Sequence, residues 1–441
     1  MDPERPGRTT PAFILMRDVL FLSYFFPPMG GGAVLRALKF VKYLPAFGWR
    51  PLVVAGAARY HLYDEQLLAE VPADTVVRRA APRRFWGRGR ARDDASVPAP
   101  GSRRFLARAG RRLSREFRRV LSFPDLYAPF AGPAYDEARN LLDEFDVRLI
   151  FSTAPPYTSH LVGERLARET GLPLVLDYRD AWAGNPFDRP PTPYHRWRTP
   201  RAEAAVLERA AAAVAVTAGM AETYRGRLPA GRPVAFIPNG YDEADFAGDV
   251  PASPGPFTVS YTGQFYGGRM PWTFLAAAGD FVASRNLGPE DFRVRLVGPI
   301  GKALTGRAET YGVAISAEGA AGHGHAVDVM RSADANLLVI GSRPGAGATL
   351  TGKIFEYLRA GRPILALVPP DGEAAALVRE FDAGRIVAPD DVAAAQAALA
   401  ELYDDRPTSA AAPPPAAGVE RFERRRLTGE LAALFDDVAG R

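Results

Sequence analysis

The strongest constraint on the fold is an alternation of short apolar runs with amphipathic stretches, which starts twice along the chain. The first series runs from residues 19–25 to residues 234–238, and the second begins at residues 258–261. Short apolar runs separated by helical stretches are typical of parallel strands joined by crossover helices. The sequence therefore predicts an α/β protein with two Rossmann-like, doubly wound domains that face each other across a cleft.

A stretch rich in Asp, Gly and Pro separates the two series and is the predicted linker. A final amphipathic helix is predicted at 422–438, beyond a Pro/Ala spacer. The predicted organisation is a disordered tail (1–11), an N-terminal domain (12–241) with a basic insertion (78–119), the linker (242–256), a C-terminal domain (257–415) and a last segment (416–441) that packs back on the N-terminal domain.

The composition excludes several kinds of functional site. The 441 residues include no cysteine, which excludes disulfides, thiolate metal sites and cysteine nucleophiles. No run reaches the roughly 18 apolar residues of a membrane-spanning helix. No targeting segment is recognisable, and we expect a cytoplasmic protein, at the inner face of the cell membrane if the basic insertion binds lipid.

The basic insertion carries most of the positive charge. Residues 78–119 contain 15 Arg against Asp93, Asp94 and Glu116, while the whole chain has a net charge of +5. Such a block is either a solvated surface or a contact for an anionic membrane or acceptor. Aromatic residues are sparse in it and no recognition motif accompanies it, so nucleic acid is not an expected partner.

Ligands of doubly wound sheets bind at the carboxyl ends of the strands. Unusual residues follow the predicted strands in both halves, so the most direct prediction is a site in the cleft between the domains. They lie at 30–32, 153–156, 179–182, 263–269, 298–302 and 342–353.

The stretch 346–367 predicts a loop, a short helix that opens near Thr351 and Gly352, a turn at Gly361 and a buried strand. Lys353 falls in the first helical turn, where the helix dipole favours anions over cations. A bound phosphate would explain this lysine, because helix N–H groups and an ammonium together bind anions. The alternative is that Lys353 and Glu356 are surface residues of an amphipathic helix.

Six segments occur in an order that resembles the group 1 (family 4) glycosyltransferases with the GT-B fold, most closely those of bacterial polysaccharide or glycoconjugate assembly. The likeness covers nearly the whole chain except the tail and residues 80–120. The segments are FPPMGGGAVLRALKFVKYLPAFGWRPLVV (26–54), FSTAPPYTSH (151–160), DYRDAW (177–182), IPNGYD (237–242), YTGQFYGGR (261–269) and TGKIFEYLRAGRPILAL (351–367).

The resemblance implies transfer of a sugar from a nucleotide-sugar donor with retention of anomeric configuration and without a metal or other cofactor. Glu356 matches the glutamate that contacts the donor ribose, and Ala348 replaces the partner glutamate that touches the hexose. Arg269 matches the arginine that holds the diphosphate. The lysine that usually follows it is missing, and we expect Lys353 to supply the second cation. The other donor-binding candidates are Gly263, Gly298, Thr351, Gly352, Gly31 and Gly32.

The resemblance places the acceptor, a glycan or a lipid-linked molecule, on the N-terminal domain. The usual histidine after the fourth strand is missing, and His160 is expected to be structural. Asp180 is the candidate for binding or activating an acceptor hydroxyl, with Asp177, Arg179 and Trp182 beside it. The alternatives are an ion pair of Arg179 that braces the loop, and a donor phosphate that takes the acceptor proton itself.

Two other functions remain open at this stage. One is a sugar-nucleotide 2-epimerase of the same fold, which needs carboxylates and histidines for proton transfer. The other is a catalytically silent sugar-nucleotide-binding subunit, which the absence of the family's hexose-contacting glutamate and histidine would fit. His323 and His325 lack metal-site spacing, and a role at a loop or a helix start is expected for them.

Overall fold

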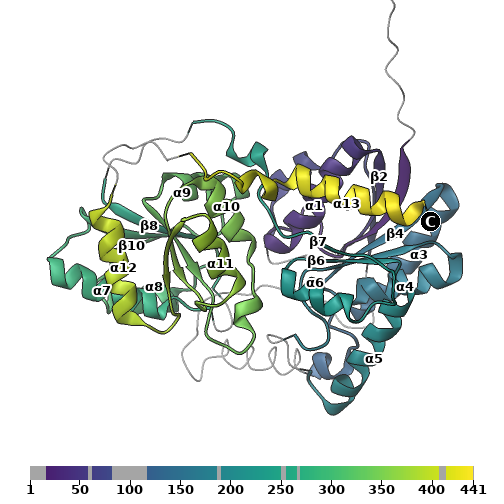
Figure 1. Ribbon diagram of the computed structural model, residues 1–441, viewed down its shortest axis with the longest axis horizontal. Coiled ribbons are helices and arrows are strands. Elements are labelled where there is room, and N and C mark those ends of the chain that lie inside the picture. The colour runs from purple at the N-terminus through teal and green to yellow at the C-terminus, as the bar shows by residue number, and fades with distance from the viewer. Residues whose placement is uncertain are drawn as a thin grey trace, which may run out of the picture.

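The structure is a computed structural model that describes residues 16–57, 62–81, 117–185, 190–249, 255–265, 269–406 and 414–440. Two parallel sheets with helices on both faces form two lobes (Figure 1). The predicted α/β fold class with two Rossmann-like domains is confirmed. The predicted tail, most of the basic insertion and part of the linker lie outside the described residues; residues 117–121 are helical.

The first sheet has seven strands in the order β3-β2-β1-β4-β5-β6-β7. The strands are β1 (Arg17–Leu22), β2 (Trp49–Gly56), β3 (Val76–Ala80), β4 (Val147–Ala154), β5 (Leu174–Tyr178), β6 (Ala212–Ala215) and β7 (Val234–Phe236). Their helices are α1 (Gly32–Tyr43), α3 (Ala131–Glu144), α4 (Thr158–Thr170), α5 (Pro193–Arg209) and α6 (Ala218–Arg225), with short turns η1 (Leu44–Phe47), η2 (Glu65–Glu70) and η3 (Ala128–Phe130). The strand order reverses between β1 and β4, which is where such sheets bind ligands.

The second sheet has six strands in the order β10-β9-β8-β11-β12-β13. The strands are β8 (Phe257–Thr262), β9 (Phe292–Val297), β10 (Ile315–Ala317), β11 (Ala335–Val339), β12 (Ile364–Leu367) and β13 (Gly384–Val387). The helices are α7 (Trp272–Arg285), α8 (Lys302–Glu309), α9 (His323–Ser332), α10 (Gly352–Ala360), α11 (Glu373–Glu380) and α12 (Val392–Asp404), with turns η4 (Glu243–Phe246), η5 (Ala346–Ala348) and η6 (Val419–Phe422). Here the order reverses between β8 and β11, beside α10.

The helix α13 (Arg424–Ala439) returns from the second lobe to the first (Figure 1, yellow). Its apolar side chains Leu427, Leu431 and Phe435 join the core beneath β1, β2 and β4. The ring of Phe435 lies 5.4 Å from the rings of both Trp49 and Phe151. This face of the first sheet is therefore completed by residues from the far end of the chain.

The structure differs from the sequence pattern in three helical segments. The pattern predicts a helix at 62–71, where the structure has only the short turn η2, and it does not predict α6. The pattern also predicts a helix from about residue 198, but α5 begins at Pro193, because Thr192 caps it: its hydroxyl accepts a hydrogen bond from the N–H of His195 at 3.3 Å. Pro200 lies inside this helix without ending it.

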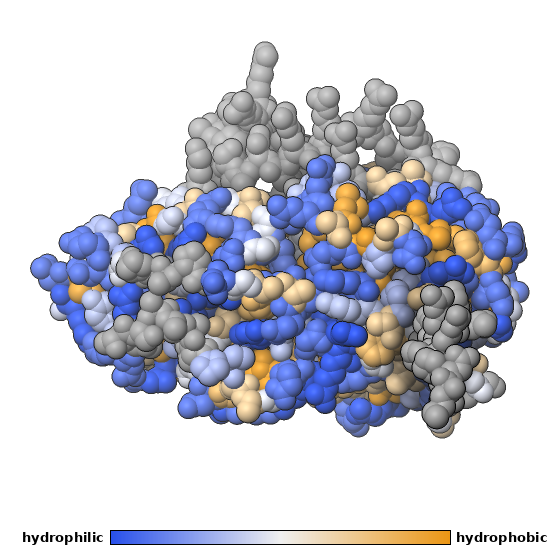
Figure 2. All heavy atoms as spheres, turned by 90° about the horizontal axis from the view of Figure 1, so that it is seen from above, coloured by the Kyte–Doolittle hydropathy of each residue, from blue (hydrophilic) through white to orange (hydrophobic). Residues whose placement is uncertain are grey.

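Within the described part of the chain, no helix is long and apolar enough to cross a membrane. Hydrophilic residues cover most of the face seen in Figure 2, with apolar residues in patches between them.

Candidate functional site

The N-terminus of α10 is the centre of the candidate site. Gly361, with φ of 71°, ends the helix, and Ile354, Phe355 and Leu358 bury its inner face. Thr351 precedes the helix in an extended conformation, and its side chain makes no capping bond. The Thr351 hydroxyl is buried and has no hydrogen-bond partner among the described residues. A buried hydroxyl without a partner is costly, which points to a ligand at this helix end.

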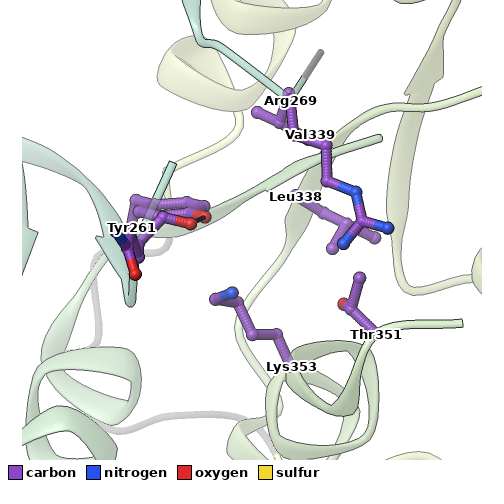
Figure 3. Close-up of a pocket in the computed structure, with 7 residues that line it drawn as sticks. Tyr261, Arg269, Leu338, Val339, Thr351 and Lys353 are labelled. Carbon is purple, nitrogen blue, oxygen red and sulfur yellow. Dashed lines mark hydrogen bonds between the residues drawn. The ribbon is translucent and has the colours of Figure 1, made fainter. Parts of the chain in front are cut away.

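Lys353 and Arg269 converge on a small pocket in front of Thr351 (Figure 3). The remaining lining residues are Tyr261, Gln264, Leu338 and Val339. Lys353 Nζ lies 5.0 Å from the centre of the Tyr261 ring. Two cations and a helix N-terminus, with no carboxylate among the described lining residues, form an arrangement that can bind an anion.

The pKa of Lys353 reflects its burial and the charges of its neighbours. Burial and, to a smaller extent, the charge of Arg269 lower its pKa to about 8, and the charge of Glu356 acts in the opposite direction. A phosphate between Lys353 and Arg269 would relieve the repulsion between the two cations. The pair predicted from the sequence is thus brought together at one anion site.

Two glycines make room for Lys353 at the ends of β8 and β9. Gly263 has φ of 115°, and a Cβ there would lie 2.7 Å from Lys353 Cε. Gly298 has φ of 142°, and a Cβ there would lie 2.1 Å from the Gly263 carbonyl oxygen. Only glycine fits this close approach of the two strand ends. Gly31 and Gly32 lie instead at the start of α1, in the other domain.

Glu356 lies one turn further along α10, and 12% of its side chain is exposed. Its Oε1 is 3.6 Å from Nε2 of His323, which in turn contacts Asp245 Oδ2 at 3.2 Å. Burial lowers the pKa of His323, but the hydrogen bond to Asp245 and the charges of Glu356 and Asp245 outweigh burial and raise it. His323 is the first residue of α9, as expected for a helix-start residue. Its contact with Glu356 was not predicted from the sequence.

Ala348 ends the turn η5 and is exposed. Only its backbone and its methyl group are available there to a ligand. The structure therefore does not supply, at this position, the side-chain contact that the missing glutamate would make.

In the first domain, Asp177 is fully buried and pairs with Arg36, whose Nη2 lies 2.7 Å from Asp177 Oδ1. The Thr153 hydroxyl also donates to Asp177 at 2.6 Å. The assignment of Asp177 to acceptor binding is therefore corrected: its carboxylate has no exposed surface and completes an ion pair in the core. The partner, Arg36, was missed because it lies 141 residues away in sequence.

Arg179 and Trp182 brace the loop after β5. The guanidinium of Arg179 donates to the carbonyls of Ala33 and Pro155 and is not the partner of Asp177. Trp182 is 5% exposed and stacks on Tyr157 with ring centres 5.0 Å apart. Both residues hold the loop in place and leave little of their own surface for an acceptor.

Asp180 is the member of this group that is accessible to solvent. The surrounding protein nevertheless raises its pKa, and the charges of Arg179 and Arg269 partly oppose this. Because Arg269 belongs to the second domain, its effect on this pKa indicates that the two side chains, from different domains, lie near each other. The structure thus brings Asp180 near the pocket of Arg269 and Lys353.

His160 is fully buried, and its Nδ1 lies 2.8 Å from the Ser152 hydroxyl oxygen. Burial lowers its pKa to about 3, so the imidazole is neutral at ordinary pH. This setting agrees with the structural role expected for His160.

Comparison with known proteins places this geometry in context. Residues 31–240 match the model of the glycosyl transferase 4-like domain. No curated protein matches the sequence. Among solved structures, HepE of Anabaena, in complex with UDP and glucose, has 16% identity and a TM-score of 0.60, covering 96% of this chain and 100% of HepE.

Two further structures resemble the whole chain. Sucrose-phosphate synthase of Thermosynechococcus elongatus has 15% identity and a TM-score of 0.58, with 96% of each chain covered. A putative UDP-N-acetylglucosamine 2-epimerase of Listeria monocytogenes has 11% identity and a TM-score of 0.54, with 95% of each chain covered. At these identities the likeness concerns the fold. Residues 31–240 of this chain are therefore similar to a glycosyl transferase 4-like domain, and the chain has, over nearly its whole length, the GT-B fold.

Proposed function

We propose that this protein is a retaining, metal-independent glycosyltransferase that moves a sugar from a nucleotide-sugar donor to an acceptor hydroxyl. The observation that carries this proposal is the pocket where Arg269, Lys353 and the unpartnered Thr351 hydroxyl meet at the N-terminus of α10. Its two cations and the helix N-terminus suit the negative charge of a nucleotide sugar's diphosphate. The family match of the first domain supports the same reaction class.

In the proposed reaction the bond between the sugar and the diphosphate breaks, and a bond to the acceptor oxygen forms on the same face. Negative charge develops on the departing diphosphate, where Arg269, Lys353 and the backbone N–H groups of α10 stabilise it. The proton of the acceptor hydroxyl passes to a phosphate oxygen of the leaving group. Asp180 orients the acceptor from the opposite wall, and Glu356 accepts hydrogen bonds from the ribose hydroxyls.

Uridine diphosphate is the nucleotide that we propose first, because HepE of similar fold was solved with UDP and with UDP-glucose. The transferred group is then a hexosyl or related glycosyl unit. We place the reaction in polysaccharide or glycoconjugate biosynthesis, with a glycan or lipid-linked acceptor, on the likeness of the six sequence segments.

Release of nucleoside diphosphate from a panel of nucleotide sugars tests the proposal directly. Replacing Arg269 or Lys353 with Ala should lower kcat/KM by about 100-fold or more, because each removes charge stabilisation of the leaving group. The matched control is Arg285→Ala, which removes an exposed ion pair with Asp404 at the far end of α7. Full activity in either pocket variant would exclude the assigned roles.

The same assay separates the other functions. An epimerase would convert the donor sugar without an acceptor and would need proton-transferring side chains in the pocket. The pocket lining, within the described residues, contains no carboxylate and no histidine, which favours the transferase. A protein that binds donors but never releases nucleoside diphosphate would be a silent binding subunit.

We also propose a peripheral contact with anionic membrane through the basic segment 78–119. A surface next to its described end supports this: Phe117, Val120, Leu121, Tyr194 and Trp197 are each between 42% and 58% exposed. The two parts of this surface are joined where His195 Nε2 contacts the Ser122 carbonyl at 2.9 Å. Residues 117–124 and 190–202 contain five Arg and no Asp or Glu, a pattern that suits a bilayer with anionic headgroups.

A further inference from the structure

A row of charged side chains connects α1 of the first domain with α10 of the second. Lys39 is 2% exposed, and its Nζ lies 2.6 Å from Glu70, 2.7 Å from Asp242 and 3.0 Å from Asp245. Asp245 is also the hydrogen-bond partner of His323 at 3.2 Å. His323 lies 3.6 Å from Glu356. The contacts therefore run without a break from Lys39 to the glutamate of the donor site.

The first half of this row is a closed charge cluster. The carboxylates of Glu70, Asp242 and Asp245 are close enough to share a cation, and the ammonium groups of Lys39 and Lys42 already lie between them. Burial alone would raise the pKa of Asp242, but Lys39 and the hydrogen bonds from Lys42 and Tyr43 lower it. Because buried ion pairs of this kind tolerate little rearrangement, Asp245 has a fixed position.

The second half of the row is less tightly made. A single nitrogen, Nε2 of His323, faces one carboxylate at 3.2 Å and another at 3.6 Å. The first distance allows a hydrogen bond and the second does not, but it is within ion-pair contact. A shift of a few tenths of an ångström would bring Glu356 Oε1 within hydrogen-bond distance. The imidazole can therefore hold Glu356 while remaining bound to Asp245.

The surroundings of Glu356 add two further cations. Its charge acts on Lys353, of its own helix, and on Arg424, at the start of α13. Arg424 is 5% exposed, and its Nη1 has no hydrogen-bond partner among the described residues. Three helices thus present cations to one carboxylate, and Nε2 of His323 lies 3.6 Å from it.

We propose that His323 is a positioning residue for Glu356, that Asp245 holds His323, and that Lys39 of the first domain holds Asp245 in turn. This inference rests on the proposed role of Glu356 as the ribose contact. With Oε1 held by His323, Oε2 is left to accept hydrogen bonds from the ribose hydroxyls. The grip on the nucleoside then depends on how the two domains are joined.

Holding the Glu356 side chain in place before the ligand binds should strengthen binding. A glutamate side chain loses rotamer freedom when a ligand orders it, and this loss weakens binding. Holding one oxygen beforehand moves the cost from the binding step to folding. Removing His323 should therefore weaken the binding of any ligand that contains the ribose and leave ligands without it unaffected.

Calorimetric titration with UDP and with inorganic pyrophosphate tests this difference on the full chain. His323→Leu should weaken UDP binding about tenfold or more, the loss expected for one charge-assisted contact, and leave pyrophosphate binding unchanged. His323→Gln keeps an N–H donor and should restore part of the UDP affinity. His325→Gln is the matched control, because His325 lies in the same helix but contacts Glu318 at 2.6 Å.

A double-mutant cycle identifies the route of the effect. If His323 acts through Glu356, His323→Leu combined with Glu356→Gln should bind UDP no more weakly than Glu356→Gln alone. Asp245→Asn should give a smaller loss of the same kind. Additive losses, equal losses for UDP and pyrophosphate, or UDP binding by His323→Leu equal to that of the wild type would each overturn the positioning role.

The binding data would differ if the proposed nucleotide-sugar site itself were wrong. If the wild-type chain binds none of UDP, GDP, ADP and dTDP, the nucleotide-sugar site itself is excluded, and the role of His323 is excluded with it. If the wild type binds UDP and His323→Leu binds it equally well, only the positioning role is excluded.

Discussion

At the scale of single residues, Lys353 determines how the candidate site should respond to pH. Its ammonium lies in the first turn of a helix, beside Arg269, and is partly withdrawn from water. The helix dipole, the charge of Arg269 and the loss of water each disfavour the charged form of Lys353. The protein thereby keeps a cation that is easily neutralised at the place where the proposed reaction needs positive charge.

We therefore expect kcat/KM for the donor to fall as the pH rises through about 8, the pKa to which burial lowers free Lys353. The sign follows because deprotonation removes the charge that holds the diphosphate, and kcat/KM reports the free enzyme. Lys353→Arg should lose this decline, since a guanidinium stays protonated at these pH values. A wild-type profile that is flat between about pH 7 and 9.5 would contradict the assignment.

Asp177 is expected to contribute to the stability of the first domain. Replacing it with Asn leaves the guanidinium of Arg36 buried without a counter-charge, which should lower the free energy of unfolding by about 3–5 kcal/mol. Urea denaturation measures this change. Asp404→Asn, which breaks an exposed pair with Arg285, should lower the free energy of unfolding far less, because water screens such a pair. Equal costs for the two variants would argue against a core ion pair.

At the scale of elements, the sequence predicted what depends on local pattern. The runs of β1 and β12 were recognisable because both of their faces are buried, so nearly every residue is apolar. Lys353 was identifiable because it falls in the first turn of a predicted helix, and Arg269 because its segment resembles the family's. The start of α5 could also have been found, since Thr192 before Pro193 is a common helix N-terminus.

The remaining features depend on packing between distant segments. The pair of Arg36 with Asp177 joins α1 to β5, and the contact of His323 with Asp245 joins residues 78 positions apart. No periodicity or short motif encodes such contacts, because the partners meet only when the sheets and helices are assembled. The same holds for Trp182, whose stacking on Tyr157 made it a support of the loop.

The core position of α13 leads to a prediction at this scale. Phe435→Ala removes a fully buried ring that touches Trp49 and Phe151, and it should lower the free energy of unfolding by about 3–5 kcal/mol. The control is Phe236→Ala on β7, where the side chain is 39% exposed. Chemical denaturation followed by tryptophan fluorescence reports the difference. An effect of Phe435→Ala no larger than that of Phe236→Ala would show that α13 contributes little to the first domain.

At the scale of the whole molecule, the two lobes divide the proposed work. The second sheet presents the anion pocket, and the first presents Asp180 and the proposed membrane surface. The chain joins the lobes at η4 and again before α13, where Tyr241 and Glu423 form a bridge and the Tyr241 N–H donates to the Phe422 carbonyl at 3.1 Å. Two crossings side by side restrict how the lobes can move.

The proposed membrane surface predicts binding to vesicles. Trp197→Ser combined with Leu121→Ser should reduce sedimentation with vesicles of about 30% anionic lipid, because both apolar contact and charge hold the protein there. Met16→Ser, an exposed apolar residue at the start of β1, serves as the control. High salt should weaken the remaining binding. No binding by the wild type at low salt would exclude this surface as a membrane contact.

The return of α13 to the first domain also affects how the protein is made. A ribosome releases β1 to β7 long before residues 424–439 exist, so the face that these residues cover stays apolar and open during synthesis of the entire second domain. The first domain thus cannot complete its folding in the order in which it is translated. Its nascent form therefore keeps an apolar face exposed to water, and an expression fragment that stops after β7 lacks part of its own core.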